Sequence, residues 1–331
     1  MNEFVDKSTT TRPLVSVVIP TFLRPQFVTR AVGSVLLQTM KSLEVVVVVA
    51  GRDHETIKAL KVIKDPRLRI HVPDRQMTGS QARNVGVELS HGTWVAFLDD
   101  DDYWMTDKLQ RQLQVAEAME SRYPVISCRL IARAESDDFV WPRRYPRANE
   151  PLCEYLFRRR SPFYGEGLLQ TSTLLAKREL LQTIPFDEHL NRFDDLDWIL
   201  RIHNLSGVDV AFPTMPDPLV VWHIDRSRVR ASNGGCWRMA IRWIRSHEHR
   251  VSRRAFSGFL LCDTSAIAGR QGDWTAFWPL WREALRGGRP DLMQILNHFA
   301  NYLTPLRLRH LTACWVALFR RRAVLSSTNV T

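Results

Sequence analysis

The chain has 331 residues, of which 45% are hydrophobic and 24% charged, a composition typical of a folded globular protein with a sizeable core. Residues 1–12 are polar and of mixed charge, which argues against a secretory signal, and no run reaches the roughly 18 apolar residues of a membrane span. The five cysteines are scattered without CxxC spacing, so they indicate reduced thiols in a cytoplasmic protein, not a disulfide framework or a structural zinc site.

The net charge of +11 is unevenly distributed along the chain. Residues 226–331 contain 18 Arg, no Lys and 5 acidic residues, a net charge of +13, whereas the residues before them carry 28 basic and 30 acidic side chains. Such asymmetry predicts contact with an anionic partner, either a membrane surface or a polyanion.

The first half of the chain alternates between strand and helix patterns. Residues 14–19 and 44–49 are β-branched runs, typical of strands that are buried on both faces of a parallel sheet. Between them, residues 25–38 place apolar side chains at helical spacing, and Pro25 suits a first helical turn. The alternation continues through helices 55–64 and 80–89, strands 69–72 and 94–98, and a helix from Thr106 to Met119. We therefore predict a doubly wound α/β domain, with Ser80 and Thr106 as helix caps.

The rest of the chain shows weaker patterns. Periodicity fades over residues 123–167, which we interpret as an insertion or a loop over a site, and it returns at 168–175 and in a helix that starts near Phe193. After Ser232 the sequence becomes rich in Arg and Trp and helical in pattern. The predicted domains are a flexible N-terminus (1–13), an α/β domain (14–230) and a basic, Trp-rich helical extension (231–331).

Four consecutive aspartates, Asp99 to Asp102, follow the apolar run 95–98. They are expected at the carboxyl end of a strand, the edge where open α/β sheets bind ligands. Carboxylates this close need a hard metal ion, basic partners or strong hydration to be ionised together. On its own, the run also fits a solvated acidic turn that starts the next helix. Neither GxGxxG nor GxxxxGK[ST] occurs, which disfavours a Rossmann dehydrogenase and a P-loop enzyme.

Several other segments accompany the acidic run in a definite order. They are the strand and Pro-containing turn Val15–Phe22, the ARNVG stretch within Gly79–Gly86, the FLDDDD stretch Phe97–Asp102 with Trp104 and Lys108–Leu109 behind it, and the acidic segments Phe186–Glu188 and Phe193–Trp198. In order and spacing they resemble glycosyltransferase family 2, inverting enzymes of the GT-A fold, over residues 14–225. The resemblance implies a GT-A domain with a C-terminal helical extension.

The resemblance also implies a donor site for a nucleotide-diphosphate sugar. The residues that would contact the donor are Pro20, Thr21, Arg24, Asp53, Arg83, Asp99 and Asp100. Asp101 would bind Mg²⁺ or Mn²⁺ at the donor diphosphate, and His223 is a second metal candidate, although a lone histidine is more often structural. For Arg83, a surface ion pair is the alternative role.

One stretch departs from the family pattern. The family often has an Asp-Asp-Gly-Ser type turn whose acid reads the nucleobase, and this chain has Val49-Ala-Gly-Arg-Asp53 there. Asp53 acting from a shifted position, Arg52 meeting a phosphate or a different base, or an altered donor site would each account for the change. The identity of the nucleotide therefore stays open.

Asp195 stands where the resemblance implies the catalytic base, and Asp194 replaces the more usual Glu before it. Inversion by direct displacement needs one carboxylate to take the proton of the acceptor hydroxyl. Helical spacing places Asp195 and Trp198 on one face, so Asp195 could face a pocket with Trp198 below it. The resemblance implies that the segment Gln170–Thr173 lines the acceptor side, and we expect Gln170, Asp194 and Trp198 there. The alternative is a helix start decorated with acids that favour its dipole.

The C-terminal extension combines tryptophan with arginine. Its tryptophans are Trp237, Trp243, Trp274, Trp278, Trp281 and Trp315. They suit either a membrane interface or the core of a helical subdomain. Leu311–Phe319, closed by Arg320–Arg322, is a candidate peripheral anchor, whereas no nucleic-acid-binding module is recognisable.

The predicted function is metal-dependent transfer of a sugar from a nucleotide-diphosphate donor, with inversion, to a saccharide or lipid-linked saccharide in surface polysaccharide assembly. We expect a cytoplasmic protein, peripheral at the inner face of the membrane. The alternative is a non-catalytic protein that binds nucleotide-sugars or polyanions on a degenerate transferase fold, an idea supported by the missing nucleobase acid.

Overall fold

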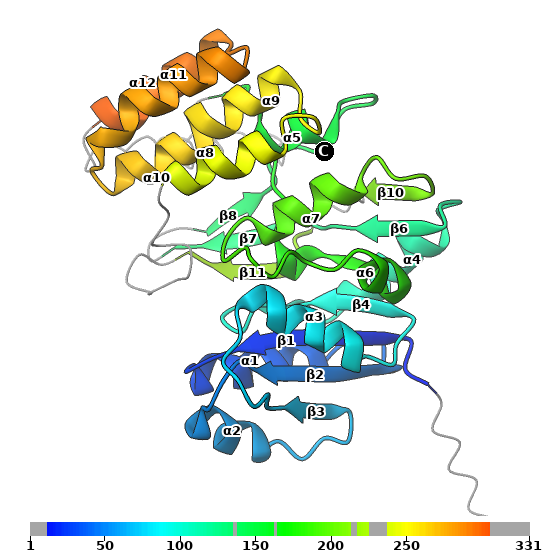
Figure 1. Cartoon of the computed structure of the whole chain (residues 1–331). Helices are drawn as coiled ribbons and strands as arrows, with labels where there is room; N and C mark the ends of the chain where they lie inside the picture. Colours follow the sequence, from blue (N-terminus) through cyan, green and yellow to red (C-terminus); the bar gives the residue numbers. More distant parts are fainter. Residues whose placement is uncertain (1–11, 135–137, 162–163, 213–216, 225–236, 305–331) are drawn as a thin grey trace, which may run out of the picture. The chain divides into compact units, whose positions relative to one another are not determined.

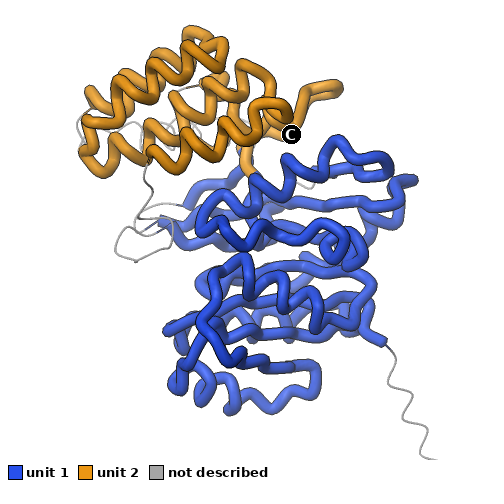
Figure 2. Tube along the Cα trace, viewed as in Figure 1, with its two compact units in different colours: residues 1–142, 169–229 blue, residues 143–168, 230–331 orange. Residues whose placement is uncertain are grey.

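The computed structural model describes residues 12–134, 138–161, 164–212, 217–224 and 237–304 (Figure 1). Residues 1–11 of the predicted flexible N-terminus and the candidate anchor Leu311–Phe319 lie outside the described residues. The chain forms two compact units, residues 1–142 with 169–229 (unit 1) and residues 143–168 with 230–331 (unit 2), coloured separately in Figure 2. Residues 143–168, predicted within the α/β domain, thus group with the helical extension instead.

Unit 1 is built around a seven-stranded sheet in the order β10-β6-β9-β4-β1-β2-β3. Its strands are β1 (Val15–Thr21), β2 (Leu43–Val49), β3 (Leu68–His71), β4 (Trp94–Phe97), β6 (Tyr123–Ile126), β9 (Leu175–Lys177) and β10 (Val208–Ala211). The pairs are parallel except those of β9, which runs antiparallel to both β4 and β6. The β-branched runs of β1 and β2 are buried, as expected for central strands.

The helices of unit 1 are α1 (Pro25–Leu36), α2 (His54–Lys61), α3 (Gly79–Leu89), α4 (Lys108–Glu117), α6 (Arg178–Thr183) and α7 (Asp194–Ile202). The predicted alternation of strand and helix is therefore confirmed, but both predicted caps are wrong. The hydroxyl of Thr78, not Ser80, accepts from the Gln81 backbone N–H in a capping box. Helix α4 begins after Asp107 without a side-chain cap, so Thr106 has no capping role.

A second sheet of unit 1 has the order β5-β11-β7-β8. Its strands are β5 (Tyr103–Trp104), β11 (Val220–His223), β7 (Leu130–Arg133) and β8 (Asp138–Trp141). Three strands, β6 to β8, therefore occupy the region that sequence periodicity assigned to an irregular insertion. Each has four residues, too few to establish a period of two.

Unit 2 is helical in its described residues. It contains α5 (Leu152–Phe157), α8 (Trp237–Ser246), α9 (Arg253–Gly258), the π-helical turn η3 (Phe259–Thr264), α10 (Ser265–Arg270), the 3₁₀ turn η4 (Trp274–Ala276), α11 (Phe277–Gly287) and α12 (Leu292–Leu303). Phe157, Trp243 and Phe259 pack ring against ring in its core. Among the described helices, none is long and apolar enough to cross a membrane.

The close packing of α3 on β1 yields a stability prediction. A Cβ on Gly86 would lie 2.2 Å from Cγ1 of Val18, whereas one on Gly33 in α1 would meet nothing within 4 Å. We expect Gly86→Ala to lower the free energy of unfolding by about 1–3 kcal/mol through overpacking. Gly33→Ala is the matched control and should raise it by ~0.5–1 kcal/mol. Chemical denaturation of both variants measures the difference, and equal effects would contradict the packing argument.

Candidate active site

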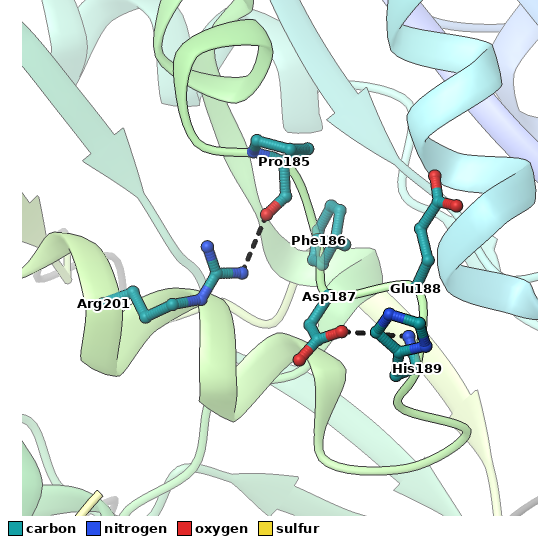
Figure 3. A pocket seen from close by; sticks show the side chains of 6 residues that line it. All are labelled: Pro185, Phe186, Asp187, Glu188, His189 and Arg201. Carbon is teal, nitrogen blue, oxygen red and sulfur yellow. Dashed lines mark hydrogen bonds between the residues drawn. The ribbon is translucent and has the colours of Figure 1, made fainter. Parts of the chain in front are cut away.

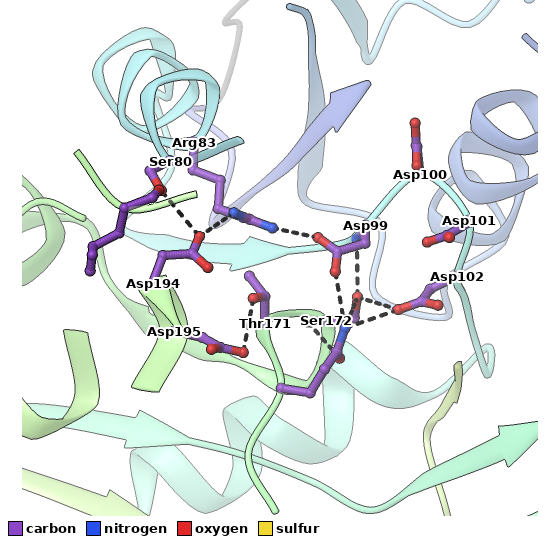
Figure 4. Close-up of polar contacts among 12 residues, drawn as sticks. Ser80, Arg83, Asp99, Asp100, Asp101, Asp102, Thr171, Ser172, Asp194 and Asp195 are labelled. Carbon is purple, nitrogen blue, oxygen red and sulfur yellow. Dashed lines mark hydrogen bonds and ion pairs between the residues drawn. The ribbon is translucent and has the colours of Figure 1, made fainter. Parts of the chain in front are cut away.

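The four aspartates lie between β4 and β5, at the carboxyl edge of the parallel strands (Figure 4). Because β1 runs parallel to β4, Thr21 reaches the same edge. Strand β9 runs the opposite way, so the segment that precedes it, the 3₁₀ turn η1 (Thr171–Thr173), also meets the aspartates here. The topology therefore gathers three distant parts of the sequence around one acidic cluster.

Arg83 joins two of the predicted site segments. From α3, its Nη2 donates to Asp99 at 2.7 Å and its Nη1 donates to Asp194 at 2.5 Å. The side chain is 11% exposed, so both ion pairs are largely shielded from water. The other carboxylate oxygen of Asp99 accepts from Gln170 Nε2 at 3.0 Å. Arg83 thus contacts the acidic run and the start of α7 together, instead of forming the surface ion pair that was its alternative role.

Asp100 is bound to the turn that follows β1. Its carboxylate accepts from the Thr21 hydroxyl at 2.8 Å and from Arg24 Nη1 at 2.9 Å. Burial raises the pKa of Asp100 to about 6 despite the Arg24 charge, because only 5% of the residue is exposed. Leu23, directly before Arg24, has a φ of 56°, a left-handed conformation that is strained for leucine.

Asp101 is the least constrained carboxylate of the run. Arg24 Nη1 approaches it at 3.3 Å, and Arg30 Nη2 donates to its main-chain carbonyl at 2.6 Å. The guanidinium of Arg30 also lies 3.4 Å from both ring nitrogens of His223, which ends β11. Positive charge against the imidazole opposes metal binding by His223.

Asp102 is fully buried, and its hydrogen bonds stabilise the structure of the site. It accepts from the Ser172 hydroxyl at 2.7 Å and from Gln170 Nε2 at 3.1 Å. Burial, reinforced by the charges of Asp99 and Asp101, raises the pKa of Asp102 well above its ordinary value. Gln170 and Ser172 therefore link Asp99 to Asp102 from below the run.

Asp194 and Asp195 begin α7 beside this cluster. The preceding Phe193 has a φ of 65°, and this left-handed turn directs the chain into the helix. Asp194 accepts from Arg83 and, at 3.3 Å, from the Ser80 hydroxyl. Asp195 is half-buried and accepts from the Thr171 hydroxyl at 3.4 Å. Burial, reinforced by the Asp194 charge, raises the pKa of Asp195 to about 7.

Two predicted site residues have other roles in the structure. The carboxylate of Asp53 is 3% exposed and accepts from the backbone N–H groups of Leu23 and Thr56, so it caps α2 and holds the β1–α1 turn. Trp198 is fully buried, and its indole N–H donates to the carbonyl of Ile184. Neither side chain is placed to contact a ligand. Pro20 lies in β1 and is paired with Val48 of β2, one residue before Thr21.

Two contributors to the site, Arg30 and Ser80, were not expected there from the sequence. Thr171 and Ser172 lie in the segment that the resemblance implied on the acceptor side, and they bond to Asp195 and Asp102. The polar run from Gln170 to Thr173 was the available signal, because four polar residues in a row ahead of the apolar β9 are unusual for a buried segment. For Arg30, helical spacing alone gave no sign of which helix face reaches the acids.

A separate surface pocket of about 420 Å³ lies on the segment that joins α6 and α7 (Figure 3). It is lined by Pro185, Phe186, Asp187, Glu188, His189 and Arg201. Its polar groups are engaged locally, since the His189 N–H donates to Asp187 and Arg201 donates to the Pro185 carbonyl. None of these side chains belongs to the acidic cluster, so we assign the pocket no role in its chemistry.

Known proteins are similar to this chain in sequence. Residues 16–184, more than half of the chain, match the family Glycosyl transferase family 2. The amylovoran biosynthesis glycosyltransferase AmsB of Erwinia amylovora is 28% identical over 248 residues, which cover 72% of this chain and 79% of that protein. The UDP-Glc:alpha-D-GlcNAc-diphosphoundecaprenol beta-1,3-glucosyltransferase WfaP of Escherichia coli is 32% identical over 105 residues, 31% of this chain and 41% of that protein.

Solved structures are similar in fold. S. aureus TarS (residues 1–349) in complex with UDP superposes with a TM-score of 0.55 at 16% identity, covering 87% of this chain and 88% of that one. The mannosyltransferase PcManGT from Pyrobaculum calidifontis, in complex with GDP-Man and Mn²⁺, gives a TM-score of 0.50 at 20% identity, covering 93% of this chain and 81% of that one. These likenesses confirm the predicted GT-A fold.

The burial of Asp100 leads to a prediction of how the free energy of unfolding changes with pH when neither metal nor donor is bound. Because its folded-state pKa is raised to about 6, folding favours the protonated acid, and this contribution is lost as pH rises from about 4 to about 6. Asp100→Asn removes the titration, so its free energy of unfolding relative to wild type should rise by at most ~3 kcal/mol over that window and then level off. Urea denaturation in a chelating buffer measures the change.

Asp65→Asn provides a control of opposite sign. Arg67 lowers the pKa of Asp65, so this variant should lose stability relative to wild type as pH rises toward about 4, and the difference should stay constant between pH 4 and pH 6. The free energy of unfolding of Asp100→Asn relative to wild type could instead stay constant or fall between pH 4 and pH 6. That result would show that Arg24 neutralises the Asp100 carboxylate.

Proposed function

The chain belongs to glycosyl transferase family 2, and from its site we propose an inverting, metal-assisted transfer of a sugar from a nucleotide-diphosphate donor to a hydroxyl of a saccharide or lipid-linked saccharide. The observation that carries this proposal is the Arg83 guanidinium, which bridges Asp99 at the end of β4 to Asp194 at the start of α7. It keeps the acid proposed for the donor and the neighbouring Asp195, proposed as the base, on one surface of unit 1 (Figure 4).

The charges of the site support a bound cation. Six aspartates, Asp99 to Asp102 with Asp194 and Asp195, face three arginines, Arg24, Arg30 and Arg83. Burial raises the pKa values of Asp100 and Asp102, and the charges of neighbouring aspartates add to the rise. A diphosphate would add further negative charge, so its binding here calls for additional positive charge.

Asp101 fits the metal best. Its carboxylate supplies hard oxygen donors and is only weakly engaged, by Arg24 at 3.3 Å. No group of three or more His, Cys, Asp or Glu side chains in the described residues is arranged to hold an ion alone, so a bound ion would take its other ligands from the donor phosphates and water. Bound Mg²⁺ or Mn²⁺ would supply positive charge that stabilises the leaving diphosphate.

The chain's own residues supply the remaining chemistry. In this proposal Asp195 accepts the proton of the acceptor hydroxyl as that oxygen attacks the anomeric carbon from the side opposite the diphosphate. The Thr171 hydroxyl and the Leu196 backbone N–H orient the carboxylate of Asp195. Arg24 lies beside Asp100 and Asp101, where it could pair with the donor diphosphate. Burial and the neighbouring Asp194 charge raise the basicity of Asp195, and the Arg83 charge partly offsets this rise.

The acceptor class rests on the relatives. AmsB is named for amylovoran biosynthesis and WfaP for transfer to a diphosphoundecaprenol-linked sugar. We therefore place this protein in polysaccharide assembly, acting on a saccharide or lipid-linked saccharide at the cytoplasmic face of a membrane. Asp53 is occupied as a helix cap, so recognition of the nucleobase falls to other groups and the donor nucleotide must be found by screening.

Donor binding tests the metal proposal. Calorimetry with UDP-, GDP- and dTDP-sugars should detect one donor class whose affinity rises when Mn²⁺ is present, because the cation offsets the acidic cluster. Asp101→Asn should weaken this metal-dependent binding by about tenfold or more, since one anionic ligand is lost. Asp209→Asn, an exposed change on β10, should bind as wild type does. Absence of metal-dependent binding for every donor would instead favour the non-catalytic alternative.

The proposed base has its own test. Asp195→Asn should lower the transfer rate by at least ~10³-fold while donor affinity stays within about threefold of wild type, because the amide cannot accept the proton. Since the pKa of Asp195 is raised to about 7 and only the ionised form is a base, the wild-type rate should increase with pH through about 7 and level off above it. Asp209→Asn is again the control, and normal turnover by Asp195→Asn would remove Asp195 from the mechanism.

A further inference from the structure

Helix α12 of unit 2 has an unusual distribution of polar and apolar side chains. Its buried residues are Gln294, His298 and Tyr302, spaced four apart on one face. Gln294 bonds to Ser257, and His298 to Ser265, inside the unit. The opposite stripe is apolar and exposed: Leu292 (71%), Leu296 (52%), Phe299 (37%) and Leu303 (65%). A helix at the surface normally buries its apolar residues and exposes its polar ones. We therefore expect a partner to cover this apolar stripe.

The neighbouring helix α11 extends the same surface. The ring of Phe299 lies 5.4 Å from that of Phe277 and 5.6 Å from that of Trp281, which places α11 alongside α12. Both helices turn their buried residues to the rest of unit 2, so their exposed residues share the other side. On α11 and the turn before it these are Trp274 (55%), Trp278 (61%) and Leu285 (50%). We call these residues and the α12 stripe the α11–α12 face.

Positive charge borders the α11–α12 face. Arg282, Arg286 and Arg289 are exposed and have no acidic partner among the described residues. The acids nearest to them in the sequence are already neutralised within unit 2, because Glu283 pairs with Arg245 and Asp291 pairs with Arg158. The face therefore combines large apolar side chains, two exposed tryptophans and unpaired arginines.

Three occupants could cover this face: residues 305–331, a second copy of the chain, or a lipid surface. Their charges differ, and this difference favours one of them. Residues 305–331 follow α12 directly and contain five Arg and no acidic residue, so packing them on the face would set arginine against arginine. A second copy of the same face would repeat that conflict. An anionic lipid surface offers phosphate to the arginines and an apolar interior to the leucines and tryptophans.

We propose that the α11–α12 face docks on an anionic membrane surface, with Trp274, Trp278 and the α12 leucines inserted below the headgroups and Arg282, Arg286 and Arg289 paired with lipid phosphate. This inference goes beyond glycosyl transfer and can be tested without a donor or an acceptor. It would hold a membrane-associated acceptor within reach of the protein, which is how it connects to the proposed function.

Vesicle flotation of the full chain tests the docking. Wild type should bind vesicles of phosphatidylcholine with about one third phosphatidylglycerol, bind phosphatidylcholine alone far less, and release with salt. A Trp278→Glu, Leu296→Glu double variant should partition at least ~10-fold more weakly. The matched control is Leu37→Glu with Val62→Glu, two changes at exposed apolar sites of unit 1 that should leave binding unchanged. Arg282→Glu with Arg286→Glu tests the charge separately and should also reduce binding.

The other occupants predict different results without lipid. If residues 305–331 cover the face, the Trp278→Glu, Leu296→Glu variant should lower the melting temperature, and if a second copy covers it, sedimentation should show a dimer that this variant dissociates. Either result would overturn the proposal. So would a face variant that floats like wild type, which would assign lipid binding to another segment. Unchanged melting and a monomeric wild type, together with weakened flotation, would support it.

Discussion

The candidate site depends on how negative charge is balanced at one edge of the seven-stranded sheet. Four consecutive aspartates follow β4, the start of α7 adds Asp194 and Asp195, and neighbouring carboxylates repel unless cations lie between them. Arg83 is central because its planar guanidinium bonds to two of them at once, which an ammonium group would do less well. Three arginines face six aspartates, so the remaining negative charge favours binding of a cation.

Much of this arrangement could be predicted from the sequence because its parts are local. A β-branched strand followed by acids, a helix carrying ARNVG and an acidic helix start are short patterns, and their order along the chain identifies the site although each alone is ambiguous. The links between them are not local. Ser172 contacts Asp102 across 70 positions, and no spacing rule relates residues that far apart.

The wrong predictions have physical causes of the same kind. Trp198 was expected near the acceptor because helical spacing puts it below Asp195, yet Asp195 is half-buried whereas Trp198 is fully buried in the core. Asp53 was one of three ways to account for the missing nucleobase acid, but its carboxylate accepts from the Thr56 N–H and caps α2. The tryptophans of unit 2 have different environments that the sequence does not distinguish. Trp243 is buried in the core, which was one of the two alternatives, whereas Trp278 is exposed.

The antiparallel course of β9 has a consequence for the order in which the protein can fold. Strands β1 to β4 and the four aspartates are synthesised well before Gln170 and Ser172, the residues that bond Asp99 and Asp102. Until β9 inserts between β4 and β6, the acidic edge of a nascent chain lacks these hydrogen bonds, and β4 lacks a neighbour on that side. Long-range strand pairing of this kind is slow to form. Insertion of β9 is therefore the step that gives β4 its second neighbour and supplies the hydrogen bonds to Asp99 and Asp102, and a shorter translation product could have the first strands without these bonds.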